Sequence, residues 1–166
     1  MEAFNYLLEN YADSKTYVEG RIWREKTNIR LRNNELAIKN LRSLARSITP
    51  SSKFHSPANA AISQAFINVQ QLDSAVYYIR NAALTAKDNR NKGRYYFLTG
   101  QLYESLKKPD SALLAFEQVV GLNRKTPRKY WINAQIKRLQ IRSIRDSLDP
   151  IESYEKLAKN YENYIF

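Results

Sequence analysis

One short helical pattern recurs along this chain at a nearly constant step. An aromatic or aliphatic residue marks the pattern five times, at intervals of 37, 38, 37 and 38 residues, and small or apolar residues follow three and four positions later. That spacing places the marked and following residues on one face of an α-helix. A fixed period of this length indicates repeated units that bury their apolar faces against one another. The five marked positions are Phe4, Leu41, Ile79, Phe116 and Tyr154.

Amphipathic segments of a second kind alternate with these copies. Their apolar residues recur three or four apart, as expected of helices with one buried face. The connections near residues 33–35, 71–74 and 108–111 are so short that neighbouring helices must be antiparallel. The sequence therefore predicts an all-α fold, a right-handed α-solenoid of antiparallel helical hairpins with about nine helices. The alternating segments cover roughly residues 15–32, 57–69, 94–106 and 127–144.

The joints between these helices carry proline. Ser56, Thr126 and Asp149 each precede a proline and are predicted N-caps, because the proline then occupies the first helical position. We expect a single array over residues 1–166, in which residues 1–14 form the second helix of a hairpin without its first. Solenoids usually close with polar capping helices, so we expect this open array to be a fragment of a longer protein. The four complete hairpins are expected at residues 15–49, 57–88, 92–124 and 127–161.

The composition argues against catalysis. The 166 residues include no cysteine and one histidine, His55, which lies in a polar stretch and is assigned no role. The sequence has no glycine-rich phosphate loop, no histidine pair and no serine with a nearby histidine base. We therefore expect a protein that is not an enzyme and uses no cofactor or metal. Apolar runs are far shorter than the roughly 20 residues that span a bilayer, and the first residues lack the pattern of a secretory signal.

The third hairpin carries a specific resemblance. Residues 95–103, followed by residues 110–116, resemble a tetratricopeptide repeat (TPR), with Thr99, Val119 and Arg124 as departures from its usual pattern. The two helices of a hairpin cross most closely at small residues, which gives a physical reason for a glycine and an alanine among the matching positions. Those positions are Tyr96, Gly100, Tyr103, Ala112 and Phe116.

A narrower resemblance spans about a third of the chain, from residue 89 to residue 136. Its two matching segments, residues 89–103 and 128–136, are similar to the PorW/SprE family of tetratricopeptide lipoproteins of Bacteroidetes. That resemblance implies an outer-membrane lipoprotein that faces the periplasm and serves type IX secretion and gliding motility, linking the translocon to the periplasmic ring and motor. The lipid-anchoring cysteine of the family is missing here, which is expected if the chain lies far from the parent's N-terminus.

Stacked hairpins line a groove with one face of each first helix, and side chains there are expected to meet a bound partner. In the fourth hairpin two registers remain open: a 34-residue step selects Trp131, Gln135 and Arg138, and a 38-residue step selects Gln135, Leu139 and Arg142. The predicted groove residues in the first three hairpins are Trp23, Thr27, Arg30, Ala60, Gln64, Ile67, Arg94, Phe97, Gln101 and Glu104.

Three glutamines stand out among these positions. Gln64, Gln101 and Gln135 could form a ladder of amides that bonds an extended peptide backbone through donors and acceptors, or they could be polar residues on a solvated face.

The formal net charge of +11 is concentrated toward the C-terminal part of the chain. Eight basic residues, and no acid, lie between Gln118 and Arg145, a segment we call the basic stretch. It could attract an acidic protein, lipid head groups, polysaccharide or nucleic acid, or it could be a solvated face balanced by acidic segments of the parent. Its bases are Arg124, Lys125, Arg128, Lys129, Lys137, Arg138, Arg142 and Arg145.

The sequence therefore predicts a protein-binding scaffold, with the family resemblance adding a periplasmic, outer-membrane-associated location through the parent protein. The alternative is a cytoplasmic TPR-type regulatory or nucleic-acid-binding protein that uses the basic stretch. Protein partners are expected in preference to nucleic acid, because no RNA-binding module accompanies the bases.

Overall fold

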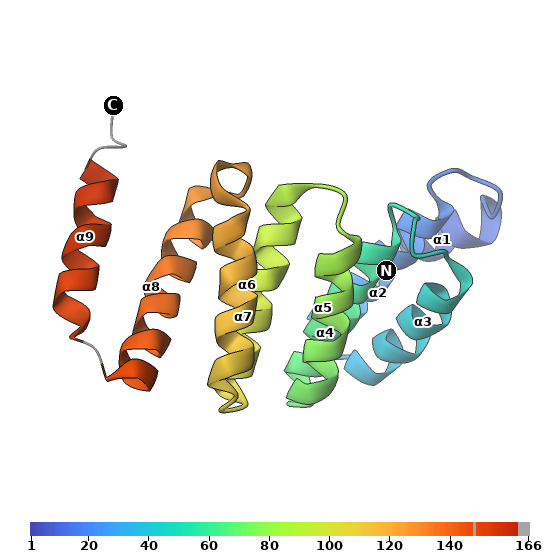
Figure 1. Ribbon diagram of the computed structural model, residues 1–166. Helices are drawn as coiled ribbons and strands as arrows, with labels where there is room; N and C mark the ends of the chain where they lie inside the picture. The colour runs from blue at the N-terminus through green and yellow to red at the C-terminus, as the bar shows by residue number, and fades with distance from the viewer. Residues whose placement is uncertain (148, 163–166) are drawn as a thin grey trace.

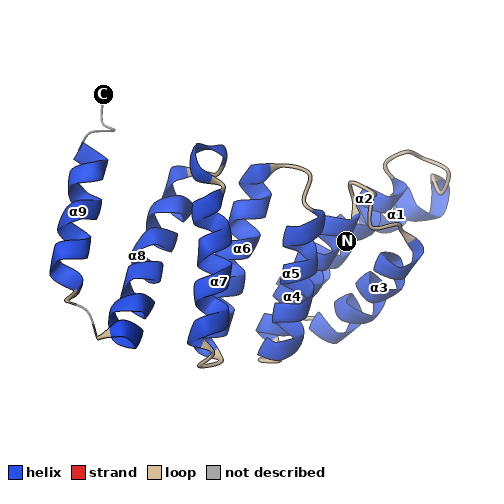
Figure 2. Ribbon diagram, in the orientation of Figure 1, coloured by secondary structure: helices blue, strands red, loops and turns tan. Residues whose placement is uncertain are grey.

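The computed structural model describes residues 1–147 and 149–162, and the regular structure of these residues is entirely helical (Figure 2). The helices stand side by side in a row that runs from α1 at one end to α9 at the other (Figure 1). They are α1 (Glu2–Asn10), α2 (Tyr17–Arg30), α3 (Asn34–Ser47), α4 (His55–Asn68), α5 (Leu72–Thr85), α6 (Asn89–Ser105), α7 (Pro109–Gly121), the short 3-10 helix η1 (Asn123–Lys125), α8 (Arg128–Asp146) and α9 (Pro150–Glu162).

The helices pair into hairpins in the predicted order. Helix α2 packs on α3, α4 on α5, α6 on α7 and α8 on α9, and each hairpin meets the next through its second helix. Helix α1 packs against α2, with the Leu7 side chain over Gly20. The predicted all-α solenoid of hairpins is therefore confirmed for the described residues.

The tight turns inside the first three complete hairpins share one backbone geometry. Arg32, Gln70 and Lys107 have positive φ angles of 67°, 59° and 56°, a conformation usually given to glycine at helix ends. The following residue donates its backbone N–H to the carbonyl five residues earlier, at 2.9 Å in every case. The repeat thus extends from the side-chain pattern to the backbone. The three bonds are Asn33 to Asn28, Gln71 to Phe66 and Lys108 to Tyr103.

The marked residues of the sequence pattern form the core. Leu41, Ile79 and Phe116 are at most 1% exposed, whereas Phe4 and Tyr154, in the end helices, are half-buried. One apolar cluster runs from α2 to α6, and a smaller one joins α7 to α8 around Phe116. The central copies therefore bury the predicted face fully, because each is covered on both sides by neighbours.

The close helix crossing predicted at Gly100 is present. A Cβ added to Gly100 would collide with the ring of Phe116, and Ala112 beside it is completely buried. The preceding hairpin has Ser63 at the matching position, where the buried hydroxyl donates to the Ala75 carbonyl at 2.9 Å. A slightly larger residue is tolerated there because its polar atom finds a partner.

Two of the three predicted N-caps are wrong. Helix α4 begins before Ser56, whose hydroxyl instead donates to the Ala82 carbonyl of α5 at 2.7 Å. Helix α8 begins after Pro127, and Thr126 is buried against Gly93 of α6. In both cases a contact with another helix takes the place of the predicted capping interaction. The third cap is confirmed, since Asp149 Oδ1 accepts the Ile151 N–H at 2.9 Å at the start of α9.

Among the described residues, none of the helices combines the length and the apolar character that crossing a bilayer requires. The same residues contain no group of three or more histidine, aspartate or glutamate side chains that could hold a metal ion.

Candidate partner-binding groove

The first helices of three successive hairpins enclose a cavity of about 310 Å³, which we call the groove. Helix α2 lines it with Trp23, Thr27 and Arg30, α4 with Gln64, and α6 with Arg94. These residues were chosen from the sequence, and the structure brings them to one surface because α2, α4 and α6 occupy equivalent places in the repeat. Their role in binding a partner remains a prediction.

The groove is strongly basic. Lys26, Arg30 and Arg94 all line it, and no aspartate or glutamate is among the residues that do so in the described part of the chain. Burial lowers the pKa of Lys26, and the neighbouring Arg94 and Arg30 lower it further, against an opposing effect of Glu19. The ammonium group is therefore held among like charges in a partly dehydrated place, which a bound anion would relieve.

An aromatic ring stands at the edge of this basic surface. Trp23 is 46% exposed, and the Lys26 Nζ lies 4.2 Å from the centre of its ring. A large exposed ring beside cations is the type of side chain that dominates protein interfaces.

The opposite side of α2 explains why this helix presents these residues. Glu25 is 1% exposed there, and its carboxylate accepts hydrogen bonds from Arg24 Nε and Asn28 Nδ2, each at 2.8 Å. Together with Ile22 and Ile29 in the core, this buried network fixes the rotation of α2.

The predicted groove residues further along α6 fall into two groups, one exposed and one in contact with neighbouring helices. Gln101 is exposed, whereas the Phe97 ring packs between Phe116 and Tyr130, with ring centres 5.6 Å from each. Glu104 forms an ion pair with Lys137 of α8 at 3.1 Å. Phe97 and Glu104 thus join α6 to its neighbours, which makes them packing residues in this structure.

The predicted residues of α8 also pack inward. Trp131 Nε1 donates to the Val120 carbonyl of α7 at 3.2 Å, and Gln135 is buried, with 9% of its surface exposed. The amide ladder therefore does not continue to Gln135, although Gln64 and Gln101 are exposed. Arg138 is half-buried, and burial together with Arg142 lowers its pKa, against the opposing charge of Glu117.

The basic stretch is partly neutralised by acids that its own sequence lacks. Lys137 pairs with Glu104 of α6, and Arg142 pairs with Glu117 of α7. Arg145 pairs with Asp146 at 2.7 Å, which lowers the pKa of that carboxyl. Four bases before the middle of α8 are exposed, namely Arg124, Lys125, Arg128 and Lys129.

Sequence reasoning missed several residues that line the groove. Lys26 lies one helical turn from Trp23 and Arg30 and is therefore on their face, so a full helical projection of α2 would have found it. Pro57, Tyr95 and Leu98 also line the groove, and no polar or charge signal distinguished them.

Comparisons with known proteins support the fold. No protein-family model matches the chain, and no curated protein matches it. Among solved structures, MamA superposes with a TM-score of 0.70 at 17% identity, covering 99% of this chain and 89% of MamA. BtubC (BKLC) from P. vanneervenii gives a TM-score of 0.75 at 11% identity, covering 99% of this chain and 72% of that one.

A third similar structure carries the name of the repeat. It is a putative kinesin light chain of Podosopora anserina with nearly identical TPR-like repeats, and it superposes with a TM-score of 0.72 at 11% identity, covering 99% of this chain and 84% of that one. At such low identity these likenesses establish the fold alone. The chain is thus a TPR-like α-solenoid.

Proposed function

We propose that this chain is a protein-binding scaffold whose groove holds an acidic, extended segment of a partner protein. The observation that carries the proposal is the convergence of Lys26, Arg30 and Arg94 on one cavity beside the exposed Trp23. TPR-like solved neighbours support the scaffold class through the shared fold.

Each part of the groove has a chemical task in this proposal. Arg30 and Arg94 bind carboxylates through paired N–H donors, and Gln64 can donate to and accept from the peptide backbone. Trp23 supplies apolar contact area at the edge. The positive potential accelerates encounter with an acidic partner and disfavours basic ones.

Lys26 gives the binding a defined pH dependence. Its pKa is lowered in the free groove, and a carboxylate bound nearby favours the protonated form. Binding therefore raises this pKa, and the affinity should fall as pH rises through the alkaline range in which free Lys26 loses its proton.

The proposal is tested with a fluorescein-labelled decapeptide of alternating glutamate and leucine. It is titrated into the full chain carrying Arg42→Gln/Arg46→Gln, which removes two exposed bases that lie outside the groove. The variant Arg30→Glu/Arg94→Glu should weaken binding at least tenfold, and Trp23→Ala should weaken it about fivefold. The matched control Lys125→Glu/Arg128→Glu makes the same change in net charge at residues that do not line the groove and should cost less than twofold. Equal losses in the two double variants would show attraction to overall charge and refute a groove site.

We further propose a cellular setting: a periplasmic, outer-membrane-associated component of type IX secretion and gliding motility, of the PorW/SprE kind. The similarity of residues 89–103 and 128–136 to that family supports this assignment. Cross-linking of the parent protein in cell-envelope fractions should capture periplasmic ring and motor proteins. A parent gene that encodes no signal peptide and no lipid-anchoring cysteine would rule the assignment out.

A further inference from the structure

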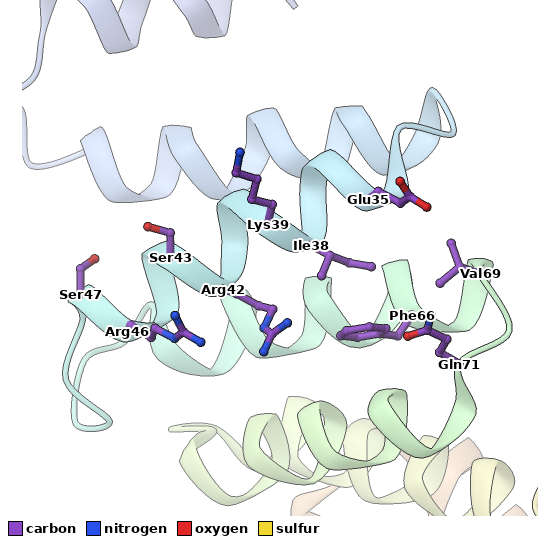
Figure 3. A pocket seen from close by; sticks show the side chains of 10 residues that line it. All are labelled: Glu35, Ile38, Lys39, Arg42, Ser43, Arg46, Ser47, Phe66, Val69 and Gln71. Carbon is purple, nitrogen blue, oxygen red and sulfur yellow. The ribbon is translucent and has the colours of Figure 1, made fainter.

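A second recess lies on the other side of α4 from the groove, between the second helices α3 and α5. It consists of two adjoining cavities, of about 770 and 540 Å³, which share Arg42, Arg46 and Phe66 in their walls. We call this recess the α3–α5 trench, and Figure 3 shows its larger part.

The two sites use opposite faces of one helix. Helix α4 lines the groove with residues 57, 60, 61 and 64 and the trench with residues 55, 59 and 66. At about 100° per residue, the two sets are centred about 180° apart on the helix. A ligand of the trench therefore does not compete with a ligand of the groove.

Helix α3 forms one wall of the trench and presents one apolar and two basic side chains in a row. Ile38, Arg42 and Arg46 follow one another at intervals of one helical turn and point to the same side of α3 in Figure 3. Both arginines are exposed, and neither is in an ion pair within the described part of the chain. Ile38 lies with Phe66 and Val69 at the end of the trench that also holds Glu35.

The facing wall offers aromatic and amide groups. The Phe66 and Tyr78 rings stack with centres 5.4 Å apart, and Tyr77 meets Tyr78 edge-on at 5.1 Å. Asn81 lines the same cavity, is half-buried and carries an amide able to bond a peptide backbone, whereas Asn59 is buried and donates to the His55 carbonyl at 2.8 Å.

We infer that the α3–α5 trench is a second docking site, for an extended acidic protein segment with an apolar residue followed by two acids at alternate positions. Side chains four residues apart on α3 are separated by about 6 Å along its axis. Side chains two residues apart in an extended peptide are separated by nearly the same distance, about 6.6 Å. The apolar residue then meets Ile38, Phe66 and Val69, and the two carboxylates meet Arg42 and Arg46.

A nucleic acid fits the trench less well. The stacked faces of Phe66 and Tyr78 already contact each other, and Glu35 at one end would repel a phosphate backbone. A peptide that places its apolar residue at the Glu35 end keeps its own carboxylates away from Glu35, and those carboxylates accept paired N–H bonds from both arginines.

The chain contains its own reporter for this site. His55 is the single histidine, and it lines the trench with its Nδ1 3.2 Å from both Thr85 Oγ1 and Asn59 Nδ2. The charged and titratable groups lining the same cavity are Arg42 and Arg46 of α3 and Tyr77 and Tyr78 of α5. Imidazole resonances of His55 thus report occupation of the trench without an added reporter group.

The test uses the labelled pentapeptide acetyl-Leu-Ser-Glu-Ser-Glu and the full chain carrying Arg30→Glu/Arg94→Glu, so that the groove makes no contribution. The peptide should shift the His55 resonances, and Arg42→Glu/Arg46→Glu, or the milder Arg42→Gln/Arg46→Gln, should weaken binding at least tenfold. The control Lys125→Glu/Arg128→Glu should change affinity less than twofold. A peptide with adjacent acids, acetyl-Leu-Ser-Ser-Glu-Glu, should bind at least threefold more weakly.

Several results would overturn the proposal. Unshifted His55 resonances during binding would place the peptide elsewhere, and equal weakening by the trench and control variants would reduce the site to overall charge. A single-stranded oligonucleotide that binds at the trench more tightly than the peptide would make it a nucleic-acid site. Because the groove is disabled throughout, these outcomes are independent of whether the groove binds a partner.

Discussion

Helices α4 and α8 are both first helices of hairpins, yet they are attached to the array in different ways. Eight of the fourteen residues of α4 are buried, against two of the nineteen in α8. Helix α4 reaches its neighbours through small residues such as Ala58, Ala61 and Ala65, whereas long charged side chains of α8 pair with acids of α6 and α7.

This difference teaches how stability is distributed along such an array. Close packing of small residues removes apolar surface from water along most of α4, and salt does not screen that contribution. Exposed ion pairs contribute little and are screened by salt, so α8 depends on a weaker attachment. We expect the α8–α9 hairpin to open before the centre of the array.

The largest expected effect comes from comparing the loss of an apolar side chain in α4 with the same loss in α8. Ile62→Ala in α4 removes a completely buried side chain and should cost about 2–5 kcal/mol of unfolding free energy. Leu139→Ala in α8 removes a half-exposed one and should cost less than about 1.5 kcal/mol. Urea unfolding followed by circular dichroism measures both, and equal losses would show that α8 is packed as tightly as α4.

Two glycines of the α6–α7 hairpin compare a closely packed position with an open one. Gly100→Ala places a methyl group into the Phe116 ring and should destabilise the protein by about 1–3 kcal/mol. Gly121→Ala is the matched control, because a Cβ there meets no atom within 4 Å. The control should leave the thermal midpoint unchanged or slightly raised. If both alanines were tolerated equally, the crossing of α6 and α7 would be looser than described.

Helix starts provide a third test, with a dependence on pH. Asp88 caps α6 by accepting the Asn91 backbone N–H at 2.8 Å, whereas α8 has no side-chain cap among the described residues. Asp88→Ala should cost about 1 kcal/mol, and Asp88→Asn, which can still cap, much less.

The charge of Asp88 sets the direction of the pH effect. The Asn91 hydrogen bonds hold the pKa of the Asp88 carboxyl below its ordinary value. Its stabilising effect is therefore present at neutral pH and is lost as pH falls through that lowered pKa. Acid titration of stability should show this loss in the wild type and lack it in Asp88→Ala. A loss of the same size in both proteins would assign it to other carboxyls.

The smallest effect concerns the ion pairs of α8. Glu117→Gln removes the partner of Arg142 and should lower the free energy of opening of α8 by about 0.2–1 kcal/mol. Hydrogen exchange should detect this at α8 amides and not at α4 amides. The difference should fade in about 1 M salt, where charges are screened within a few ångströms. A loss that persists in high salt would point to packing instead.

Much of the fold could be predicted because its evidence is local and repeated. The positions of Leu41, Ile79 and Phe116 identified the buried face from spacing alone, and Gly100 identified the closest crossing. Ser56 and Thr126 were misassigned as caps because contacts with α5 and α6, far away in sequence, compete with the local capping rule.

The candidate site was only partly predictable for a related reason. Trp23, Arg30, Gln64 and Arg94 could be placed on one surface because equivalent helices present equivalent faces. Phe97 and Gln135 follow the same rule, yet Phe97 packs against Tyr130 of α8 and Gln135 is buried. Periodicity does not reveal which neighbour covers a given position.

The sequence by itself determined the period, the hairpins and the faces that are apolar, because helix formation and amphipathic spacing depend on residues within a few turns. Only the tertiary structure decided which charges remain available. Glu104 pairs with a lysine 33 residues away and Glu117 with an arginine 25 residues away, while Arg42 and Arg46 stay exposed beside the trench. Pairing is a matter of distance in space, and that distance is set by how the hairpins stack.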